Sequence, residues 1–475
     1  MRKLRAALPL LTALALLLSG CSGKSSKEAL KPLDEKEQAK IKVMFWDQNY
    51  FFQEYGNLFI SKFPNLDIEV ANMQSIYNSE ADPTTAFEKF VEENKPDVLM
   101  LFMDQLGSFA KAGKLYALDP VIKQDNFDIA GIQPSVVNAL REKGDGQLYG
   151  LSPTFGSKAL FYNADLFQKY GVEPPRDSMS WEEVMALAKR FPTDGPEDER
   201  IYGLNTETYD TLDRLVYTIA ATEKLRLLNA EGTQVMIDSD AWKKVLQTVV
   251  DAIRSKAIHL ASEEDRKKLQ GALMMEDLYK MDMFLMGRSA MTVASGGEIQ
   301  SLRQAKDQMK SVKPVNWQIV TAPVDPSNRN QSGSIDLYNI FAVNAASTNQ
   351  RAAWEFVKFV NGEGYAKIKG KSGAFGDFLS RTTYMAEQDG RSLEPFYKLD
   401  PQPAFSIFPE RIPGNFYGDY TQGMAKGLDA AIKGEKTLDE AVAAIKEELQ
   451  QALTVARKAD ERKKAEQASA SPSAG

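Results

Sequence analysis

The sequence has very few of the two side chains on which much enzyme and metal chemistry depends. Among 475 residues it has one cysteine, Cys21, and one histidine, His259. A Ser-His-Asp triad or a histidine-rich zinc site would have to depend on His259 alone, and we expect this residue at an exposed helix end. A glycosidase with paired carboxylates needs no histidine, and Asp47 and Asp104 are its formal candidates. Nothing in the sequence sets these two apart as an acid and a base, so we expect no catalytic residues and no enzyme activity.

Two further absences restrict the partners. The body of the chain has no long basic run and the formal net charge is −7. We therefore expect no nucleic-acid partner and no polybasic contact with an anionic membrane. What is present is globular composition, with 43% hydrophobic residues and enough length for two or more cores.

The first 20 residues predict a lipoprotein signal peptide. A short basic start, "MRKLR", precedes the apolar run "AALPLLTALALLL", which is too short to span a bilayer comfortably. The run ends in "LSGC", which resembles a bacterial lipobox, where cleavage precedes the cysteine and the cysteine is diacylated. We therefore predict lipidation of Cys21. The alternative for a lone cysteine is a buried free thiol.

Polar segments flank the body of the chain. Residues 21–40 have few large apolar side chains and predict a flexible tether, with two lipid chains at Cys21 as the anchor. Residues 456–475 are charged and then low in complexity, which predicts a fraying helix followed by a disordered tail.

Strand and helix patterns alternate in the first part of the body. Continuous apolar runs predict strands at Ile41–Trp46 and Pro96–Phe102, and the alternation in "LDIEVANM" predicts another. Helix patterns follow in "TTAFEKFVEEN" and "LGSFAKAGKLYAL". This order predicts an α/β fold with a mainly parallel sheet, in which ligands lie beyond the carboxyl ends of the strands. Trp46, Asp47 and Asp104 follow such strand ends.

The later part of the chain is richer in helix. Capping boxes pair Ser180 with Glu183 and Thr437 with Glu440 at the starts of two predicted helices. "FLMGRSAMTVASGGE" predicts a helix end, a turn at Gly287, a short strand and a glycine-rich loop, and "LYNIFAVN" predicts a strand. Helical spacing in "SDAWKKVLQTVVDAIRS" predicts a buried face made of Ala241, Val245, Val249 and Ile253.

In this order the segments resemble a known family. The stretches "IKVMFWD", "KPDVLMLFMDQLGSFAKAGKLYALD", "DGQLYGLSPTFGSKALFYNADLF", "FLMGRSAMTV" and "AVNAASTNQRAAWEFVKFV" resemble successive segments of extracellular solute-binding proteins of family 1, the maltose-binding-protein-like lipoproteins of carbohydrate ABC importers. The resemblance spans most of residues 41–450. It implies a periplasmic-binding-protein-like α/β fold, with two discontinuous lobes joined by crossing strands and a ligand cleft between them that closes by hinge motion.

The resemblance also implies the domain boundaries and the first lobe crossing. Between Asp145 and Phe167, strand-like ends flank a polar centre with Pro153 and Gly156, which fits a bent strand that crosses between lobes and forms a wall of the cleft. The expected segments are 41–150 with about 338–395 for the N-terminal lobe, and 151–337 with about 396–455 for the C-terminal lobe.

Sugar sites need carboxylates or amides for hydroxyl groups and aromatic planes for apolar faces. Trp46 and Asp47 are candidates because they follow the first strand. The alternatives are core packing for Trp46, Phe416 and Tyr417, and helix capping for Asp47 and Asp104. The resemblance places these residues in the cleft: Asp104, Phe155, Ser157, Gly297 and Glu298, and with them Phe416 and Tyr417 of "GNFYGDY".

One departure from the family pattern concerns the ligand. Many members carry a tryptophan after "AMT" that stacks on sugar, whereas this chain has "VASGGEI" with the Glu298 carboxylate. This leaves room for a smaller, more polar or cationic ligand. The acidic stretch 194–199 lacks the alternate oxygen spacing of a calcium loop, so we expect a solvated turn, no metal and no cofactor.

The sequence therefore predicts a monomeric binding protein that captures a sugar or oligosaccharide and delivers it to ABC permease subunits. Its lipid anchor would hold it on the extracellular face of the cell membrane of a Gram-positive bacterium. Two alternatives stay open, namely binding of a non-sugar polar solute and ligand sensing for a membrane histidine kinase, which would use the same cleft.

Overall fold

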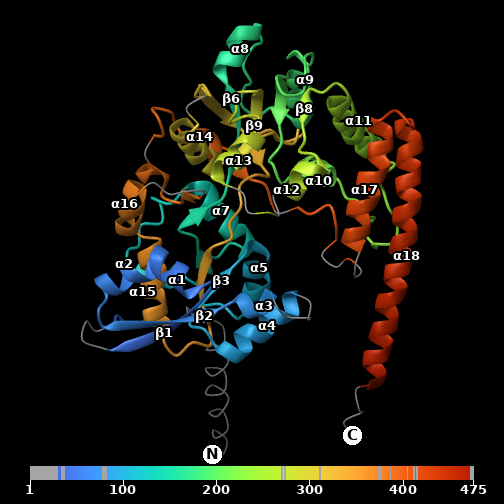
Figure 1. Cartoon of the computed structure of the whole chain (residues 1–475). Helices are drawn as coiled ribbons and strands as arrows, with labels where there is room; N and C mark the ends of the chain where they lie inside the picture. Colours follow the sequence, from blue (N-terminus) through green and yellow to red (C-terminus); the bar gives the residue numbers. More distant parts are fainter. Residues whose placement is uncertain are drawn as a thin grey trace, which may run out of the picture.

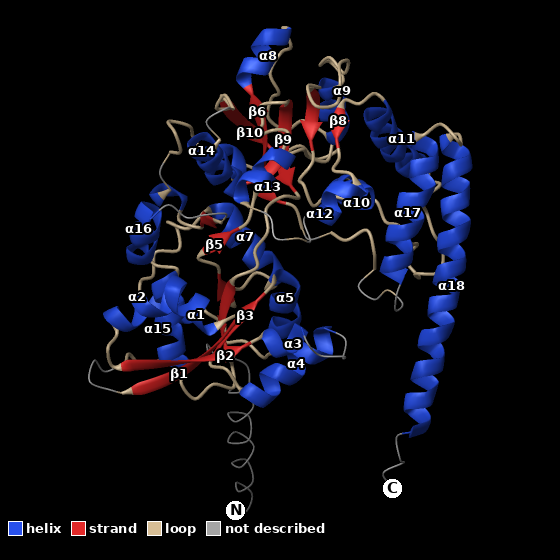
Figure 2. Cartoon of the chain, in the orientation of Figure 1, coloured by secondary structure: helices blue, strands red, loops and turns tan. Residues whose placement is uncertain are grey.

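Two five-stranded sheets lie in two lobes, one below the other in Figures 1 and 2. The computed structural model describes residues 30–33, 38–77, 83–268, 271, 274–309, 312–372, 377–385, 387–403, 405–409, 412 and 416–470. The predicted signal peptide, the lipidation site Cys21 and most of the predicted tether lie outside these ranges. None of the helices within them is long and apolar enough to cross a membrane.

The N-terminal lobe is built on a mixed sheet whose inner strands are largely buried. β1 and β3 carry runs of large apolar side chains, as the sequence predicted, because both faces of this sheet are covered by helices. Figure 1 shows α15 and α2 on one side of the sheet and α3, α4 and α5 on the other. In spatial order the strands are β2 (Leu66–Asn72), β1 (Ala39–Phe45), β3 (Val98–Leu101), β12 (Ile340–Val343) and β4 (Gly150–Leu151).

The helices of this lobe come from two distant parts of the chain. Trp354, Val357 and Val360 of α15 are buried against the first sheet, whereas Phe359 is half-buried. The elements are α1 (Gln48–Phe51), the π-helical turn η1 (Phe52–Gly56), α2 (Asn57–Lys62), α3 (Gln74–Tyr77), α4 (Pro83–Asn94), α5 (Met103–Lys111), α6 (Asp119–Gln124), α7 (Pro134–Lys143), α15 (Gln350–Val360) and α16 (Glu363–Ser372).

Ion pairs reinforce this lobe at two very different depths. The Asp125 carboxylate is 9% exposed and accepts from Arg351 at 2.8 Å, Lys358 at 2.7 Å and the indole of Trp354 at 3.0 Å. Burial alone would raise the pKa of Asp125, but these donors outweigh it and hold that pKa at about 2. Glu69 on β2 also binds two cationic side chains, yet its own side chain is 43% exposed.

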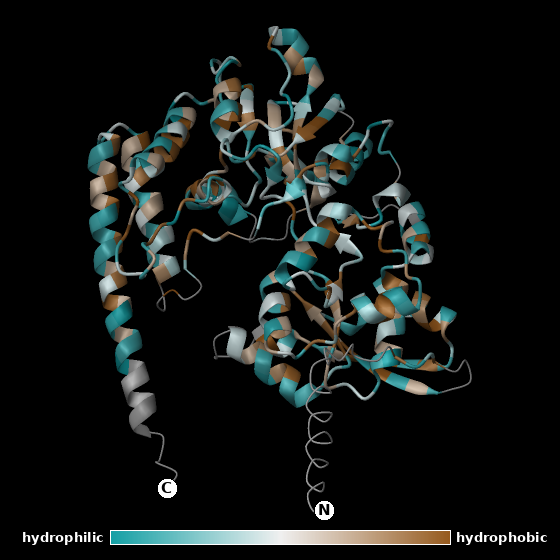
Figure 3. Ribbon diagram, turned by 180° about the vertical axis from the view of Figure 1, so that it is seen from behind, coloured by the Kyte–Doolittle hydropathy of each residue, from teal (hydrophilic) through white to brown (hydrophobic). Residues whose placement is uncertain are grey.

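The C-terminal lobe is built on a second mixed sheet. The predicted capping box of Ser180 and Glu183 opens α9, and that of Thr437 and Glu440 precedes α18. Figure 3 shows hydrophobic residues on the strands and hydrophilic ones along much of α18, which lies beside α17. In spatial order the strands are β10 (Trp317–Thr321), β6 (Lys158–Asn163), β9 (Ser289–Ser295), β7 (Tyr202–Asn205) and β8 (Ile258–His259).

The helices of this lobe each bury one apolar face, and the sequence predicted the residues of that face only in part. In α11, Val245 and Val249 are buried as expected, but Ala241 is exposed and Ile253 is half-buried, because the stripe is centred on Trp242 instead. The helices are α8 (Ala164–Tyr170), α9 (Trp181–Ala188), α10 (Leu212–Thr222), α11 (Asp240–Arg254), α12 (Glu263–Lys268), α13 (Met275–Met281), α14 (Gly297–Gln308), α17 (Phe416–Ile432) and α18 (Leu438–Ala470).

The mainly parallel sheet predicted for the first part of the body is wrong, because the first sheet is mixed, and the second sheet is mixed as well. In the first sheet β1 pairs in parallel with β2 and β3, while β12 is antiparallel to β3 and β4. In the second sheet β7 is parallel to β8 and β9, while β6 is antiparallel to β9 and β10. Strands such as β12 and β6 enter their sheets after crossing from the other lobe, so no helical crossover requires them to run parallel.

Three chain segments cross between the lobes and are bonded to one another. β4 belongs to the first sheet and β6 to the second, so the segment from Ser152 to Ser157 crosses between them. Its strand β5 (Thr154–Phe155) pairs with β13 (Phe378–Leu379), and Gly156 exchanges two backbone hydrogen bonds of 2.9 Å with Asp336. A Cβ on Gly156 would lie 2.9 Å from the Tyr338 ring, so this close approach needs glycine.

These crossings divide the chain as a discontinuous two-lobe fold. The lobe boundaries at about 338–395 and 396–455 stay predictions. Residues near 391–396 contact the C-terminal lobe, Arg391 through Trp317 and the 3₁₀ turn η3 (Glu394–Phe396) through Phe161. The short strands β11 (Gln331–Ser332) and β14 (Asp400–Pro401) pair in parallel beside the crossing.

Candidate functional site

A cavity of about 380 Å³ lies between the lobes, beside the crossing segment that contains Asp336. The C-terminal lobe contributes β6, the loop after β7, and α10, while the N-terminal lobe contributes the start of α5 and the end of α7. The side chains that line the cavity include Met103 and these polar or aromatic residues: Glu142, Lys143, Lys158, Asn205, Thr206, Glu207, Asp210, Arg214, Tyr217, Thr218, Thr222, Ser334, Asp336, Gln402 and Phe405.

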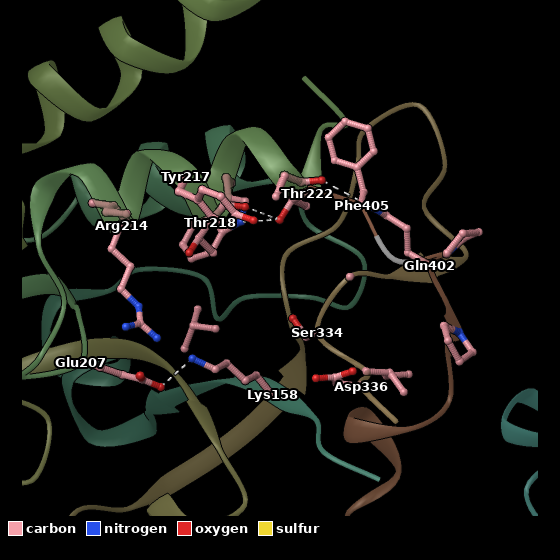
Figure 4. A pocket seen from close by; sticks show the side chains of 18 of the residues that line it. Lys158, Glu207, Arg214, Tyr217, Thr218, Thr222, Ser334, Asp336, Gln402 and Phe405 are labelled. Carbon is pink, nitrogen blue, oxygen red and sulfur yellow. Dashed lines mark hydrogen bonds and ion pairs between the residues drawn. The ribbon is translucent and has the colours of Figure 1, made fainter. Parts of the chain in front are cut away.

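Charged side chains gather on one side of the cavity. The Lys158 Nζ lies 2.7 Å from Glu207 Oε1, and Arg214 Nε lies 3.4 Å from Asp210 Oδ1. Figure 4 shows the Arg214 side chain extending toward the Lys158–Glu207 pair. Burial raises the pKa of the Asp210 carboxyl, and repulsion from Glu207 raises it further.

Aromatic rings and neutral polar groups form another part of the lining. The rings of Tyr217 and Phe405 are half-buried, so part of each is open to the cavity. Arg226 stacks over the Phe405 ring with its guanidinium carbon 4.7 Å from the centroid. The buried Gln402 side chain binds the carbonyl of Ala221 at 3.4 Å, and Figure 4 shows Gln402 and Phe405 on the same side of the cavity.

The N-terminal lobe supplies a charged rim. Lys143 at the end of α7 is bound to Asp104 in the first turn of α5, with 2.9 Å between Nζ and Oδ1. Glu142, next to Lys143, is exposed. The rim and the C-terminal lobe therefore present charges to each other across the opening.

A cluster of polar groups is centred on Asn205, which is buried and belongs to the cavity lining. Its amide donates to Asp282 Oδ1 at 3.1 Å, and its Oδ1 lies 2.9 Å from His259 Nδ1. Burial raises the pKa of Asp282 to about 6. Burial also raises the pKa of Glu298 well above its usual range, with repulsion from Asp282 and Glu207 adding to it. The Glu298 Oε1 atom has no hydrogen-bond partner among the described residues.

The prediction that His259 sits at an exposed helix end is wrong. It is half-buried in the two-residue strand β8, its ring edge contacts Tyr202, and burial lowers its pKa. A strand this short carries no periodic signal, so the sequence could not reveal it.

Three predicted site residues take the alternative roles considered for them. Trp46 is half-buried and packs edge-on against Phe102. The Asp47 carboxylate accepts the backbone N–H of Tyr50 at 2.9 Å and caps α1. Phe416 is fully buried in the core of the C-terminal lobe.

Two others are buried within the lobe crossing itself. Phe155 is 1% exposed and packs against Phe378 and Tyr397, because β5 is covered by β13 and the segment that follows it. Ser157 is buried, and its hydroxyl donates to the carbonyl of Phe396 at 2.5 Å. The crossing forms a wall between the lobes, but these two side chains face its interior.

The remaining predicted residues lie outside the cavity lining. Asp104 is exposed and does not cap α5, since it lies inside the first turn. Gly297 is the first residue of α14, so the expected glycine-rich loop is a helix start, and Glu298 follows it as a half-buried side chain. Tyr417 is 52% exposed and packs against Phe408. Ligand contact by any of the nine stays a prediction.

The residues of the cavity lining were not predicted from the sequence, although at two places in the chain the sequence carried a signal for ligand binding. Thr206 and Glu207 directly follow β7, whose carboxyl end is where an α/β sheet binds ligands. Lys158 directly follows Ser157 in the crossing stretch. Tyr217 and Phe405 had no such signal, because an aromatic residue in a helix or loop is usually a packing residue.

No group of histidine, cysteine and acidic side chains in the described part of the chain has the arrangement of a metal site. Within that part the lining is suited to holding a polar solute by hydrogen bonds and ring contacts. The acidic stretch 194–199 is exposed and falls in a turn region before β7.

The architecture and the interlobe cavity are those of a solute-binding protein. The model of the bacterial extracellular solute-binding protein family matches residues 46–367, and the chain belongs to this family. Proteins of this family bind solutes and are not enzymes.

Comparisons with individual proteins agree with this assignment. The arabinooligosaccharide-binding protein of Bacillus subtilis is 22% identical over 257 residues, which are 53% of this chain and 54% of that protein. The chain thus spans about half the length of the curated relatives it matches.

Solved structures share the fold over nearly the whole chain. A sugar transporter from Rhizobium etli in an open conformation has a TM-score of 0.58 and 17% identity, with 86% of this chain and 99% of that chain covered. The sugar-binding protein MalE from Xanthomonas citri has a TM-score of 0.57 and 16% identity, with 89% and 99% covered. At these identities the likeness shows the periplasmic-binding-protein-like fold alone.

Proposed function

We propose that this chain captures a sugar or oligosaccharide in the interlobe cavity and delivers it to the permease of an ABC importer. The observation that carries the proposal is the combination of half-buried rings, Tyr217 and Phe405, with the carboxylates Glu207, Asp210 and Asp336 in one cavity. Rings cover the apolar faces of a sugar, and carboxylates accept hydrogen bonds from its hydroxyl groups. The names of the similar proteins, which refer to sugars, support the same ligand class.

In this proposal, ligand binding stabilises the closed conformation of the two lobes, and the ligand undergoes no reaction. Most of the lining belongs to the C-terminal lobe, and the N-terminal lobe adds the ends of α5 and α7. A ligand held on the C-terminal lobe would favour the conformation in which Met103 and Lys143 also reach it. The hinge would be the bonded crossing at Gly156.

The predicted anchor completes the proposal. A lipidated Cys21 would hold the monomeric protein on the extracellular face of the membrane, close to the permease subunits it serves. Metabolic labelling with a radioactive fatty acid tests this point. Label should enter the wild-type protein and be absent from Cys21→Ser.

Titration calorimetry with a panel of mono- and oligosaccharides tests the ligand class. We expect at least one sugar to bind, and Tyr217→Ala to weaken that sugar about tenfold through the loss of a ring contact. Tyr417→Ala is the matched control, since this ring is exposed outside the cavity lining. Failure of the whole panel to bind would refute the carbohydrate proposal. A larger loss in Tyr417→Ala than in Tyr217→Ala would move the site away from the cavity.

A further inference from the structure

The three basic side chains that line the cavity are all engaged by acidic ones. Lys158 is paired with Glu207, Arg214 with Asp210, and Lys143 with Asp104. A ligand carboxylate would therefore have to compete with an existing partner for each cation. The cavity offers an anion no free positive charge among the described residues.

Two acidic side chains of the lining have no such partner. Neither Glu142 nor Asp336 lies within ion-pair distance of a basic group in the described ranges. Asp336 is held in place by its two backbone hydrogen bonds to Gly156, and Figure 4 shows its carboxylate among the lining side chains near Ser334 and Lys158. This carboxylate is therefore positioned in the cavity before any ligand arrives.

The surroundings of Asp336 add to the excess of negative charge. Although solvent reaches Asp336, the walls of the cavity remove part of its hydration, and this raises the pKa of its carboxyl. Repulsion from Asp104 raises the same pKa further. A cation placed beside Asp336 would relieve both effects, whereas a second anion would increase them.

From this arrangement we infer that the solute carries a protonated amino group, as an amino sugar does, and that Asp336 and Glu142 bind it. The inference rests on the proposed carbohydrate function and narrows it to cationic sugars. The amine would donate charge-assisted hydrogen bonds to one or both carboxylates, and the rest of the sugar would use the rings and neutral polar groups.

Calorimetry with matched oligosaccharides tests the inference at about pH 6, below the usual pKa of an amine. The probes are β-1,4-linked di- and trisaccharides of glucosamine, of N-acetylglucosamine and of glucose, together with uronic acid oligosaccharides. We expect the glucosamine series to bind about tenfold more tightly than the glucose series, and the advantage to shrink in high salt. The uronic acid series should bind most weakly.

Variants assign the effect to the two carboxylates. Asp336→Asn should reduce glucosamine affinity about tenfold while changing glucose affinity little, and Glu142→Gln should act in the same direction. Glu231→Gln is the matched control, since Glu231 is an exposed carboxylate outside the cavity lining. Misfolding of Asp336→Asn would weaken binding of both the glucosamine and the glucose series. A loss of affinity for the glucosamine series alone therefore reports charge recognition.

The outcomes separate this inference from the function on which it rests. If neutral or acidic oligosaccharides bind as tightly as the amino series, the inference is overturned and the carbohydrate function stands. If the amino preference exists but survives in both variants, the assignment to Asp336 and Glu142 is overturned. If no carbohydrate binds, the proposed function fails as well.

Discussion

Replacing Asp282 by asparagine should stabilise the protein at neutral pH, although it alters a buried hydrogen-bonded group. All three hydrogen bonds that Asp282 accepts end on Oδ1, from the backbone N–H groups of Phe284 at 2.8 Å and Leu285 at 3.1 Å and from Asn205 at 3.1 Å. An asparagine oxygen can accept the same three bonds. The substitution therefore removes a charge while keeping the contacts.

The magnitude follows from the pKa of this carboxyl. Burial raises the pKa of Asp282 from 3.8 to about 6, which corresponds to roughly 3 kcal/mol of differential free energy. Because the folded-state pKa is the higher one, the contribution of Asp282 to stability is fully present below about pH 4 and is lost as the pH rises through about 6. Asparagine does not titrate, so the variant escapes this loss.

Urea unfolding of wild type and Asp282→Asn at about pH 4 and about pH 7 measures the effect. We expect similar stability at the lower pH and an advantage of about 1–3 kcal/mol for the variant at the higher pH. Groups that do not interact with Asp282 act equally in both proteins and cancel in the difference, whereas Glu298 loses the repulsion from Asp282 in the variant, which adds to the advantage at the higher pH. Asp198→Asn makes the same chemical change at an exposed position of the same lobe and should show no pH-dependent advantage. A variant that is equally or less stable than wild type at both pH values would refute the reasoning.

Two further predictions concern the stability of each lobe. Asp125→Asn should cost about 2–3 kcal/mol in urea unfolding because it removes the carboxylate shared by Arg351 and Lys358, which then keep only Glu355 as an acidic partner among the described residues. Glu69→Gln, whose pKa is also held at about 2, should cost less than about 1 kcal/mol because solvent screens its exposed pairs. Equal costs would show that burial does not decide the strength of these pairs. Gly203→Ala should lower the melting temperature of the C-terminal lobe, since its Cβ would lie 2.0 Å from the backbone oxygen of Ala188. Gly418→Ala in α17 meets nothing within 4 Å and should leave the melting temperature unchanged or raise it, and a stable Gly203→Ala would contradict this packing.

Local patterns predicted most of the elements correctly. The buried strands β1, β2, β3 and β12 were readable because their apolar runs are continuous or alternate cleanly. The starts of α9 and α18 were readable because a capping box is a contact between residues three apart. The crossing between β4 and β6 was predicted from the resemblance to the family, and its polar, kinked centre between strand-like ends fits that prediction.

The candidate site was largely beyond such patterns. Asp47 follows a strand end, as a ligand-binding carboxylate would, but the same position also suits a helix cap, and only the observed bond to Tyr50 separates the two. Phe155 sits among small polar residues, yet β13 and Tyr397 cover it from more than 200 positions later in the chain. Burial by such distant segments leaves no trace in the local sequence.

By itself the sequence determined the α/β character through local periodicity, and the order of its segments carried the resemblance that implied the family and its two-lobe fold. It also showed that the chain has only one histidine and one cysteine, so few side chains could support catalysis or metal binding of the kinds that depend on them. Only the tertiary structure decided which side chains face the interlobe cavity, which basic groups are already paired, and that Asp336 has no cationic partner among the described residues. Those properties depend on distances between residues as far apart as Met103 and Phe405, and such distances are set only when the crossing segments bring the two lobes together.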